Sequence, residues 1–426
     1  MGTLRTVAFF AATFVVAGGA LVVACTGPTG PAGQTGMTGP TGSQGTPGQQ
    51  GPAGDAGPPG VMPDGGLSAS CLSPCHGFGG VVEQYKTSVH YAAYVENLNG
   101  GEVASWTGSG QACGNCHAID ALEQRAAGNV LFNGDAGPSN VFFGQMEYAN
   151  SSNGKLSEST YAGAAKVAAV YCTTCHAVTD ANDPHKTGNA WTPGSFPFQV
   201  PVDAGDPTYI EKSLPEAGVT GQSIGVLAEA NTCIWCHRSR KDVTNYITAS
   251  NNTSQYWGPH EGPQADVYSG KGGYHYANKT YGTSTHQSKL TCTDCHMPPV
   301  ASNQGVPNHS FYAQISVCQN CHADAGSFDV IGGETAVKSA LSQVQTALLA
   351  KGWITNPNGP VGSGTWATDQ ATTQSGLTAD QAGAIYDYML VARGGAFGVH
   401  NPVYAKELLY DAYVAITGSA PTFLRP

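Results

Sequence analysis

The sequence has 426 residues, of which 41% are hydrophobic and only 11% are charged, and its formal net charge is −11. This acidic balance excludes nucleic acid as an expected partner, because a phosphate backbone would be repelled. The hydrophobic fraction gives a thin core for a chain of this length, so we expect another apolar component in the interior.

Residues 1–24 are predicted to be a lipoprotein signal peptide. Arg5 supplies a positive charge, and residues 7–23 are apolar but too short and too rich in glycine for a good membrane-spanning helix. The residues before Cys25 resemble a bacterial lipobox, which implies cleavage before Cys25 and lipidation of its thiol. Thr26 then points, by the rule for that family, to the outer membrane, on its periplasmic or cell-surface side. An ordinary secretory signal peptide is the alternative.

Residues 25–62 are predicted to form a collagen-like stalk after the lipidated cysteine. Glycine occupies every third position from Gly27 to Gly60, giving 12 Gly-X-Y triplets with many prolines. Only glycine fits the axis of a triple helix, and such a stalk would be about 110 Å long at ~3.1 Å per residue. It would make the protein a homotrimer, whereas a single extended chain would act only as a spacer. Residues 63–70 are expected to be a short hinge.

One cysteine motif recurs through residues 71–330. Five copies are C-x-x-C-H and a sixth has one extra residue between its cysteines, so the motifs use 12 of the 13 cysteines. The motif residues are Cys71, Cys75 and His76; Cys113, Cys116 and His117; Cys172, Cys175 and His176; Cys233, Cys236 and His237; Cys292, Cys295 and His296; and Cys318, Cys321 and His322.

This motif is the attachment signature of c-type haem. Two thiols three positions apart lie on one side of a turn, where each can bond a porphyrin vinyl group, and the histidine becomes the proximal iron ligand. The alternatives are structural zinc, thiol redox pairs and disulfides. A zinc site does not require a histidine after every second cysteine, and a redox pair is normally single. Six covalent haems c are therefore predicted, and they would supply the apolar interior.

The predicted fold is mainly α-helical and irregular, with a haem head at 71–330 organised around stacked haems. Strand-like alternation is weak, and the segments between motifs are rich in Gly, Asn, Ser and Thr. Residues 331–426 are expected to contain three helices that pack back on the head. The first spans 334–351 by its apolar spacing, the second begins at the capping box 378–381, and the third runs from Asn401-Pro402 to about Gly418.

Seven histidines remain outside the motifs, and six haems that only carry electrons need six distal ligands. Bis-histidine ligation throughout is therefore the economical interpretation, and it favours lower potentials than His/Met ligation. Which distal histidine serves which iron is left open by the sequence.

Several segments resemble multihaem cytochromes of metal-respiring bacteria, which carry electrons to the cell exterior. They are 260–266 with Gly270 and 272–273, then 284–286 before 292–298, 308–311 before Cys318, and 398–402 with 404–405 and 408–409. The resemblance implies that His260, His286, His309 and His400 are distal ligands. His90 and His185 complete the six by position, and His275 lies where the pattern has no ligand. The C-x-x-x-C-H motif and the lipidated, collagen-like front end depart from the family.

Three functions are compatible with these features. The first is an electron conduit at the outer membrane that passes electrons to other redox proteins or to extracellular acceptors such as metal oxides. The second is a subunit of a polymeric cytochrome filament, in which His90 could ligate the iron of a neighbouring copy. The third is a multihaem reductase with one open haem, although no C-x-x-C-K motif marks one. The first, which is not an enzyme, is favoured.

Overall fold

The computed structural model describes residues 75–77, 79–96, 114–117, 122, 170–183, 186, 189, 197–199, 230–239, 243–301, 305–357 and 366–426. The chain divides into two compact units, Met1–Val61 and Met62–Pro426, and all described residues belong to the second. The predictions for the signal peptide, Cys25, the stalk and the hinge lie outside the described residues. So do those for Cys71, Cys113 and His185.

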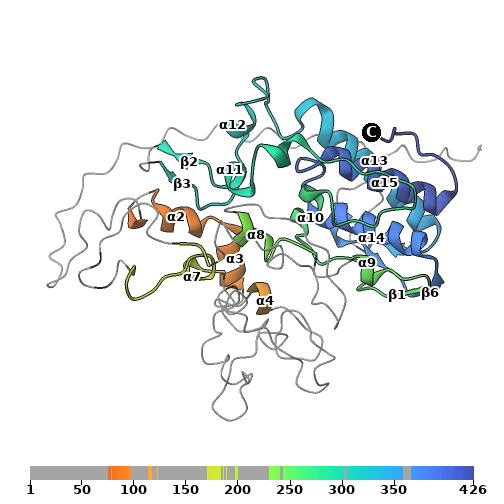
Figure 1. Ribbon diagram of the computed structural model, residues 1–426, viewed down its shortest axis with the longest axis horizontal. Helices are drawn as coiled ribbons and strands as arrows, with labels where there is room; N and C mark the ends of the chain where they lie inside the picture. The colour runs from red at the N-terminus through yellow and green to blue at the C-terminus, as the bar shows by residue number, and fades with distance from the viewer. Residues whose placement is uncertain are drawn as a thin grey trace, which may run out of the picture. The chain divides into compact units, whose positions relative to one another are not determined.

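Short helices joined by irregular segments make up the motif-bearing part of the chain (Figure 1). This confirms the prediction of a mainly helical and irregular fold. The helices are α2 (Val81–Lys86), α3 (Val89–Glu96), α4 (Gly114–His117), α7 (Cys172–Cys175), α8 (Asn231–Ile234), α9 (Val243–Tyr246), α10 (Gln264–Ser269), α11 (Cys292–His296) and α12 (Ile315–Cys318), with 3₁₀ turns η6 (Thr285–Ser288), η8 (Val330–Gly332) and η9 (Trp366–Thr368).

The strands within the described residues form three antiparallel pairs. The pairs are β1 (Asn251–Thr253) with β6 (Gln374–Leu377), β2 (Pro299–Val300) with β3 (Val306–Pro307), and β4 (Ile354–Thr355) with β5 (Gln370–Ala371). None is longer than four residues, so they fasten loops rather than build a layer. The β1–β6 pair joins the segment after α9 to the residues directly before α14.

The three predicted C-terminal helices are present: α13 (Gly333–Ala350), α14 (Ala379–Gly394) and α15 (Pro402–Thr417). Thr378 and Gln381 form the predicted capping box of α14, in which the Thr378 hydroxyl accepts from the Gln381 amide at 3.3 Å. Asn401 caps α15 by accepting from the Tyr404 amide at 3.0 Å, and its first helical residue is a proline.

These helices bury the main hydrophobic core of the described chain. α15 packs against both α13 and α14, and α14 also packs against α10 (Figure 1). The apolar stripe of α13 is fully buried, as its spacing predicts. Its members are Val337, Leu341, Val344 and Leu348. The core therefore reaches the segment between the motifs at 233–237 and 292–296.

No helix among the described residues is long and apolar enough to cross a membrane.

Candidate cofactor-binding site

Each C-x-x-C-H motif is called here by the numbers of its first cysteine and its histidine. In the described motifs the cysteines lie on a single helical turn. The histidine amide donates to the carbonyl of the first cysteine at 2.9 Å in motif 172–176, 2.9 Å in motif 233–237 and 2.8 Å in motif 318–322. This turn brings the side chains at positions one and four onto the same face. The motif can therefore present two sulfur atoms together, as the attachment of haem requires.

The residue before the second cysteine caps the turn in two motifs. The Thr174 hydroxyl accepts from the Tyr171 amide at 2.9 Å, and a carboxylate oxygen of Asp294 accepts from the Thr291 amide at 2.5 Å. A single helical turn is too short for further backbone hydrogen bonds to offset the cost of forming it, so these side-chain hydrogen bonds stabilise it. The variable positions of the motif thus help to define its conformation.

Four motif histidines of the described chain lie opposite a predicted distal histidine. The distances between ring centroids are 6.0 Å for His237 and His90, 6.4 Å for His176 and His309, 6.3 Å for His296 and His400, and 6.4 Å for His322 and His286. Every pair joins one proximal to one distal candidate, from segments well separated along the chain.

These separations match two imidazoles on opposite sides of one metal ion. A metal–imidazole bond is about 2.0–2.1 Å long. The ring centre lies about 1.1 Å behind the bonded nitrogen, so two trans ligands have their centres about 6 to 6.5 Å apart. If the imidazoles only packed against each other, nothing would require the same separation of ring centroids in all four pairs. The residues present therefore fit an iron porphyrin at each of these pairs.

The second ring nitrogen of several of these histidines is held by a hydrogen bond. The Nδ1 acceptors are Gln264 Oε1 for His237 at 3.0 Å, the Val399 carbonyl for His286 at 3.1 Å, the Phe311 carbonyl for His296 at 2.8 Å, and the Pro307 carbonyl for His309 at 2.7 Å. A carbonyl can only accept, so Nδ1 carries the hydrogen and Nε2 is left with its lone pair. Metal-bound histidines are oriented by partners of this kind.

His90 and His400 show the opposite pattern. Their Nδ1 atoms are buried and have no hydrogen-bond partner in the described structure. Burial, reinforced by neighbouring histidines, lowers the pKa of each to about 4. Burial likewise lowers the pKa of His309. A neutral imidazole is the form that binds a metal, and a buried nitrogen without a protein partner is uncommon. Both features fit a pocket that takes up a metal-bearing group.

Three of the described motifs lie next to one another in chain order. The side chains of Cys233 and Cys292 contact each other, which brings together the motifs at 233–237 and 292–296. The Gln314 amide donates to the Cys295 carbonyl at 3.3 Å, and α12 packs against α11. The motif at 318–322 is therefore the next neighbour of the motif at 292–296.

Phe311 lies where three of the histidine pairs meet. Its carbonyl accepts from His296, and its ring centroid is 4.9 Å from that of His90 and 5.9 Å from that of His309. Its φ of +59° is a left-handed conformation that a bulky residue rarely adopts. A strained residue at a junction of this kind is commonly retained for function.

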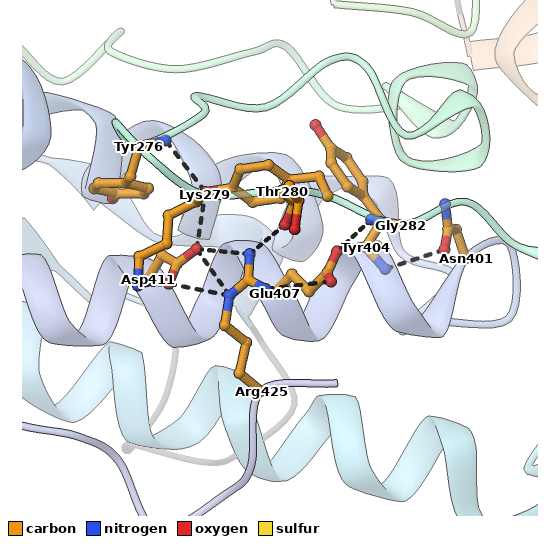
Figure 2. A network of polar contacts seen from close by, with 10 residues as sticks. Tyr276, Lys279, Thr280, Gly282, Asn401, Tyr404, Glu407, Asp411 and Arg425 are labelled. Atoms are coloured by element: carbon orange, nitrogen blue, oxygen red, sulfur yellow. Dashed lines mark hydrogen bonds and ion pairs between the residues drawn. The ribbon is translucent and has the colours of Figure 1, made fainter.

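The polar network of Figure 2 fixes the loops that carry His286 and His400. Arg425 extends from the C-terminal segment to Asp411, Glu407 and the Thr280 carbonyl (Figure 2), with Nη2 2.6 Å from the Thr280 oxygen. Glu407 also accepts from the Gly282 amide at 2.6 Å. The loop ending at Gly282 leads into η6 with His286, and Asn401, which caps α15, follows His400.

Two remaining histidines have other surroundings. The side chain of His260 is 50% exposed, and its Nδ1 donates to the Glu261 carbonyl at 3.1 Å. His275 stacks on Tyr281 at 4.1 Å, and its Nε2 lies 2.8 Å from the Tyr404 hydroxyl. This contact orients the His275 ring toward α15.

His76 and His117 belong to motifs that are described only in part. His76 is exposed, and His117 ends α4 and is half-buried. The structure brings neither of them into one of the four pairs.

Sequence reasoning did not assign roles to Gln264, Phe311 or Val399. Each lies inside a segment that carries the family resemblance, within a few residues of a predicted ligand. Their proximity to the predicted ligands is the signal in the sequence that could have indicated a role for them. Two of the three act through a backbone carbonyl, however, and side-chain chemistry cannot reveal such a role.

No family model matches the sequence, and no curated protein matches it. Among solved structures, the chain is similar to the crystal structure of outer cell wall cytochrome OcwA, with a TM-score of 0.40 and 18% sequence identity. The similarity covers 79% of this chain and 50% of the other, so the chain spans about half the length of that protein.

Proposed function

We propose that this protein is a hexahaem c-type cytochrome that carries electrons through a series of bis-histidine haems. The observation that supports it best is the set of four proximal–distal histidine pairs, with ring centroids 6.0 to 6.4 Å apart. Haem c would supply a one-electron couple between ferric and ferrous iron. The protein contributes ligands, burial and hydrogen bonds that set the potential of each site.

The pairs support a definite ligand assignment. We assign His309 to the iron of motif 172–176, His90 to that of motif 233–237, His400 to that of motif 292–296 and His286 to that of motif 318–322. The two remaining irons would belong to motifs 71–76 and 113–117, and His185 and His260 are proposed as their distal ligands.

Two protein ligands on each iron leave no position for a substrate. This favours electron transfer over the reductase alternative, because a catalytic haem needs an open coordination site. The contacts between motifs at 233–237, 292–296 and 318–322 support transfer between neighbouring sites along the chain. A single polypeptide would thereby connect distant points on its surface.

Export, the lipid anchor at Cys25 and the stalk at 25–62 belong to the same proposal. They would hold the haem head at the outer membrane, within reach of other redox proteins or of extracellular acceptors such as metal oxides. In the filament alternative His90 would ligate a neighbouring copy. His90 instead lies 6.0 Å from His237 of its own chain, which favours the tethered conduit.

Carbon monoxide binding to the reduced full-length holoprotein tests this function. The wild type is expected to bind none, since every iron already has two protein ligands. His400→Ala is expected to bind about one equivalent, and His286→Ala with His400→Ala about two. His275→Ala is the matched control and is expected to bind none. One equivalent bound by the wild type would mean an open haem and would contradict the bis-histidine proposal.

A further inference from the structure

Ile331 combines a high solvent exposure with an unfavourable backbone conformation, and neither contributes to the stability of the fold. Its side chain is 95% exposed, and its φ is +49°. Glycine or asparagine adopts this left-handed conformation readily, whereas a β-branched residue is a rare outlier there. An apolar side chain that is both strained and in water gains nothing from folding. Such outliers point to a functional role.

The turn around Ile331 is built firmly, so its side chain projects from a fixed place. Asp329 accepts from both the amide of Thr335 at 3.0 Å and its hydroxyl at 2.6 Å. These bonds connect η8 to the first turn of α13. Gly332 follows with a φ of +74°. The strain at Ile331 is therefore held by the surrounding turn.

This turn is tied to the motif at 318–322. The Ala325 amide donates to the His322 carbonyl at 2.8 Å, and Gln319 Nε2 donates to the Ala325 carbonyl at 2.9 Å. Phe328 keeps 37% of its surface in water. The segment that joins α12 to α13 thus carries two exposed apolar side chains, Phe328 and Ile331, a few residues after motif 318–322.

The charges beside the apolar pair are mainly negative. Asp324 is exposed, and Asp329 lies two residues before Ile331 in the chain. Glu334 and Lys338 neutralise each other in an ion pair at 2.5 Å, so the two aspartates supply the local net charge. The protein as a whole has a net charge of −11. An apolar contact rimmed by carboxylates complements a partner with an apolar contact rimmed by lysines.

We propose that Phe328 and Ile331, rimmed by Asp324 and Asp329, form the docking surface for a positively charged redox protein that exchanges electrons with the haem of motif 318–322. This inference rests on the proposed function and adds the partner's charge and the point of contact. Steering by the acidic rim sets the encounter rate, and burial of the two apolar side chains holds the complex.

A small basic monohaem cytochrome c is the probe for this surface. The second-order rate constant of electron transfer from the reduced full-length holoprotein is measured by stopped flow, and affinity by calorimetry. Ile331→Asn is the main variant, because asparagine tolerates the positive φ and preserves the turn. We expect the rate constant and the affinity to fall about five- to tenfold, as for a central contact residue. Tyr256→Asn, at a residue 79% exposed elsewhere, is the control and should change neither.

Asp324→Lys tests the charge of the rim. It is expected to lower the rate constant and to flatten its dependence on ionic strength, while the thermal midpoint is unchanged. Wild-type rates and affinities for both Ile331→Asn and Asp324→Lys would overturn the docking surface. A shift of self-association by Ile331→Asn in sedimentation, with unchanged transfer to the probe, would make a second copy the occupant and would also overturn it.

Direct electrochemistry distinguishes failure of the docking surface from failure of the proposed electron-transfer function. Reversible reduction of all variants at an electrode, with wild-type spectra, would show that the haem chain is intact even where docking fails. A wild-type protein that shows no reversible reduction would instead contradict electron carriage itself.

Discussion

His286 and Val399 are joined by a hydrogen bond in which the Nδ1–H of the histidine donates to the backbone carbonyl at 3.1 Å. The next residue in the chain is His400, the proposed distal ligand of the neighbouring motif. Two proposed ligands of different irons are thus connected through a single peptide unit. The orientation of one imidazole is coupled to the loop that carries the other.

His286→Met tests this assignment through redox potential. The thioether is a possible iron ligand, and His/Met ligation has a higher potential than bis-histidine ligation. One of the six haems is expected to shift to a higher potential in spectroelectrochemistry, with a smaller change in a second because the bond to Val399 is lost. His275→Met should leave all six unchanged, and a shift in that control would contradict the chosen ligands.

Arg425→Ala is expected to destabilise the protein. The guanidinium lies 3.1 Å from Asp411 and 3.4 Å from Glu407, and both carboxylates are almost fully buried. Because the arginine itself is partly exposed, water screens part of the interaction, and we expect a loss of about 1–3 kcal/mol in the free energy of unfolding. Denaturant unfolding of the variant and the wild type measures this difference.

The matched control is Lys338→Ala, which breaks the surface ion pair with Glu334. We expect a change of less than about 0.5 kcal/mol, as for exposed pairs along a helix. Equal losses for the two variants would mean that the network of Figure 2 does not hold the loop before His286 against α15.

Gly272→Ala is expected to destabilise the protein by at least about 1–3 kcal/mol, as overpacking does. A Cβ atom at this position would lie 2.1 Å from the Cβ of Asp266, whose carboxylate accepts from the Ser239 amide at 2.7 Å. Ser239 comes two residues after the motif histidine His237, so the variant should also disturb that site.

Gly333→Ala provides the control for this substitution. Gly333 is the first residue of α13 and has helical dihedral angles, and a Cβ there would meet nothing within 4 Å. Alanine loses less backbone entropy than glycine on folding, so we expect stabilisation of about 0.5–1 kcal/mol. Thermal unfolding measures both variants. A shift of the midpoint temperature in the same direction for both would contradict the close packing at Gly272.

Asp387 should make stability depend on pH. It is fully buried and accepts from the Tyr274 amide at 2.6 Å, and burial raises its pKa well above 3.8. The native state therefore keeps a proton that the unfolded state releases above about pH 4. Its contribution to stability is full below the unfolded pKa and is lost as pH rises toward the folded pKa. Asp387→Asn should remove this decline in unfolding curves.

Asp329→Asn is the control of opposite sign. Hydrogen bonds from Thr335 lower the pKa of Asp329 below its usual 3.8. Its contribution is present above the unfolded pKa and is lost as pH falls through the folded pKa. This variant should remove the fall in stability on the acid side and leave the slope of the profile at neutral and alkaline pH unchanged. An altered slope at alkaline pH would contradict the assignment of the two carboxyls.

The sequence by itself determined the features that depend on near neighbours along the chain. The turn of each C-x-x-C-H motif, the capping box at Thr378 and the start of α15 at Asn401 involve residues within four positions of one another. Local hydrogen bonds and helix propensity fix such features, and a pattern of a few residues reveals them. The identity of the candidate ligands follows in the same way, because side-chain chemistry is written in the sequence.

Only the tertiary structure decided which side chains meet. The approach of His90 to His237 and of His400 to His296 depends on how long loops close, and many closures are compatible with one sequence. The contacts of the Phe311 and Val399 carbonyls are invisible to residue chemistry, since every residue has a carbonyl. The exposure of Ile331 is decided by the packing of α13, because an isoleucine read in sequence is expected inside. Pairing, burial and exposure are long-range properties, and they turn a row of motifs into an ordered set of sites.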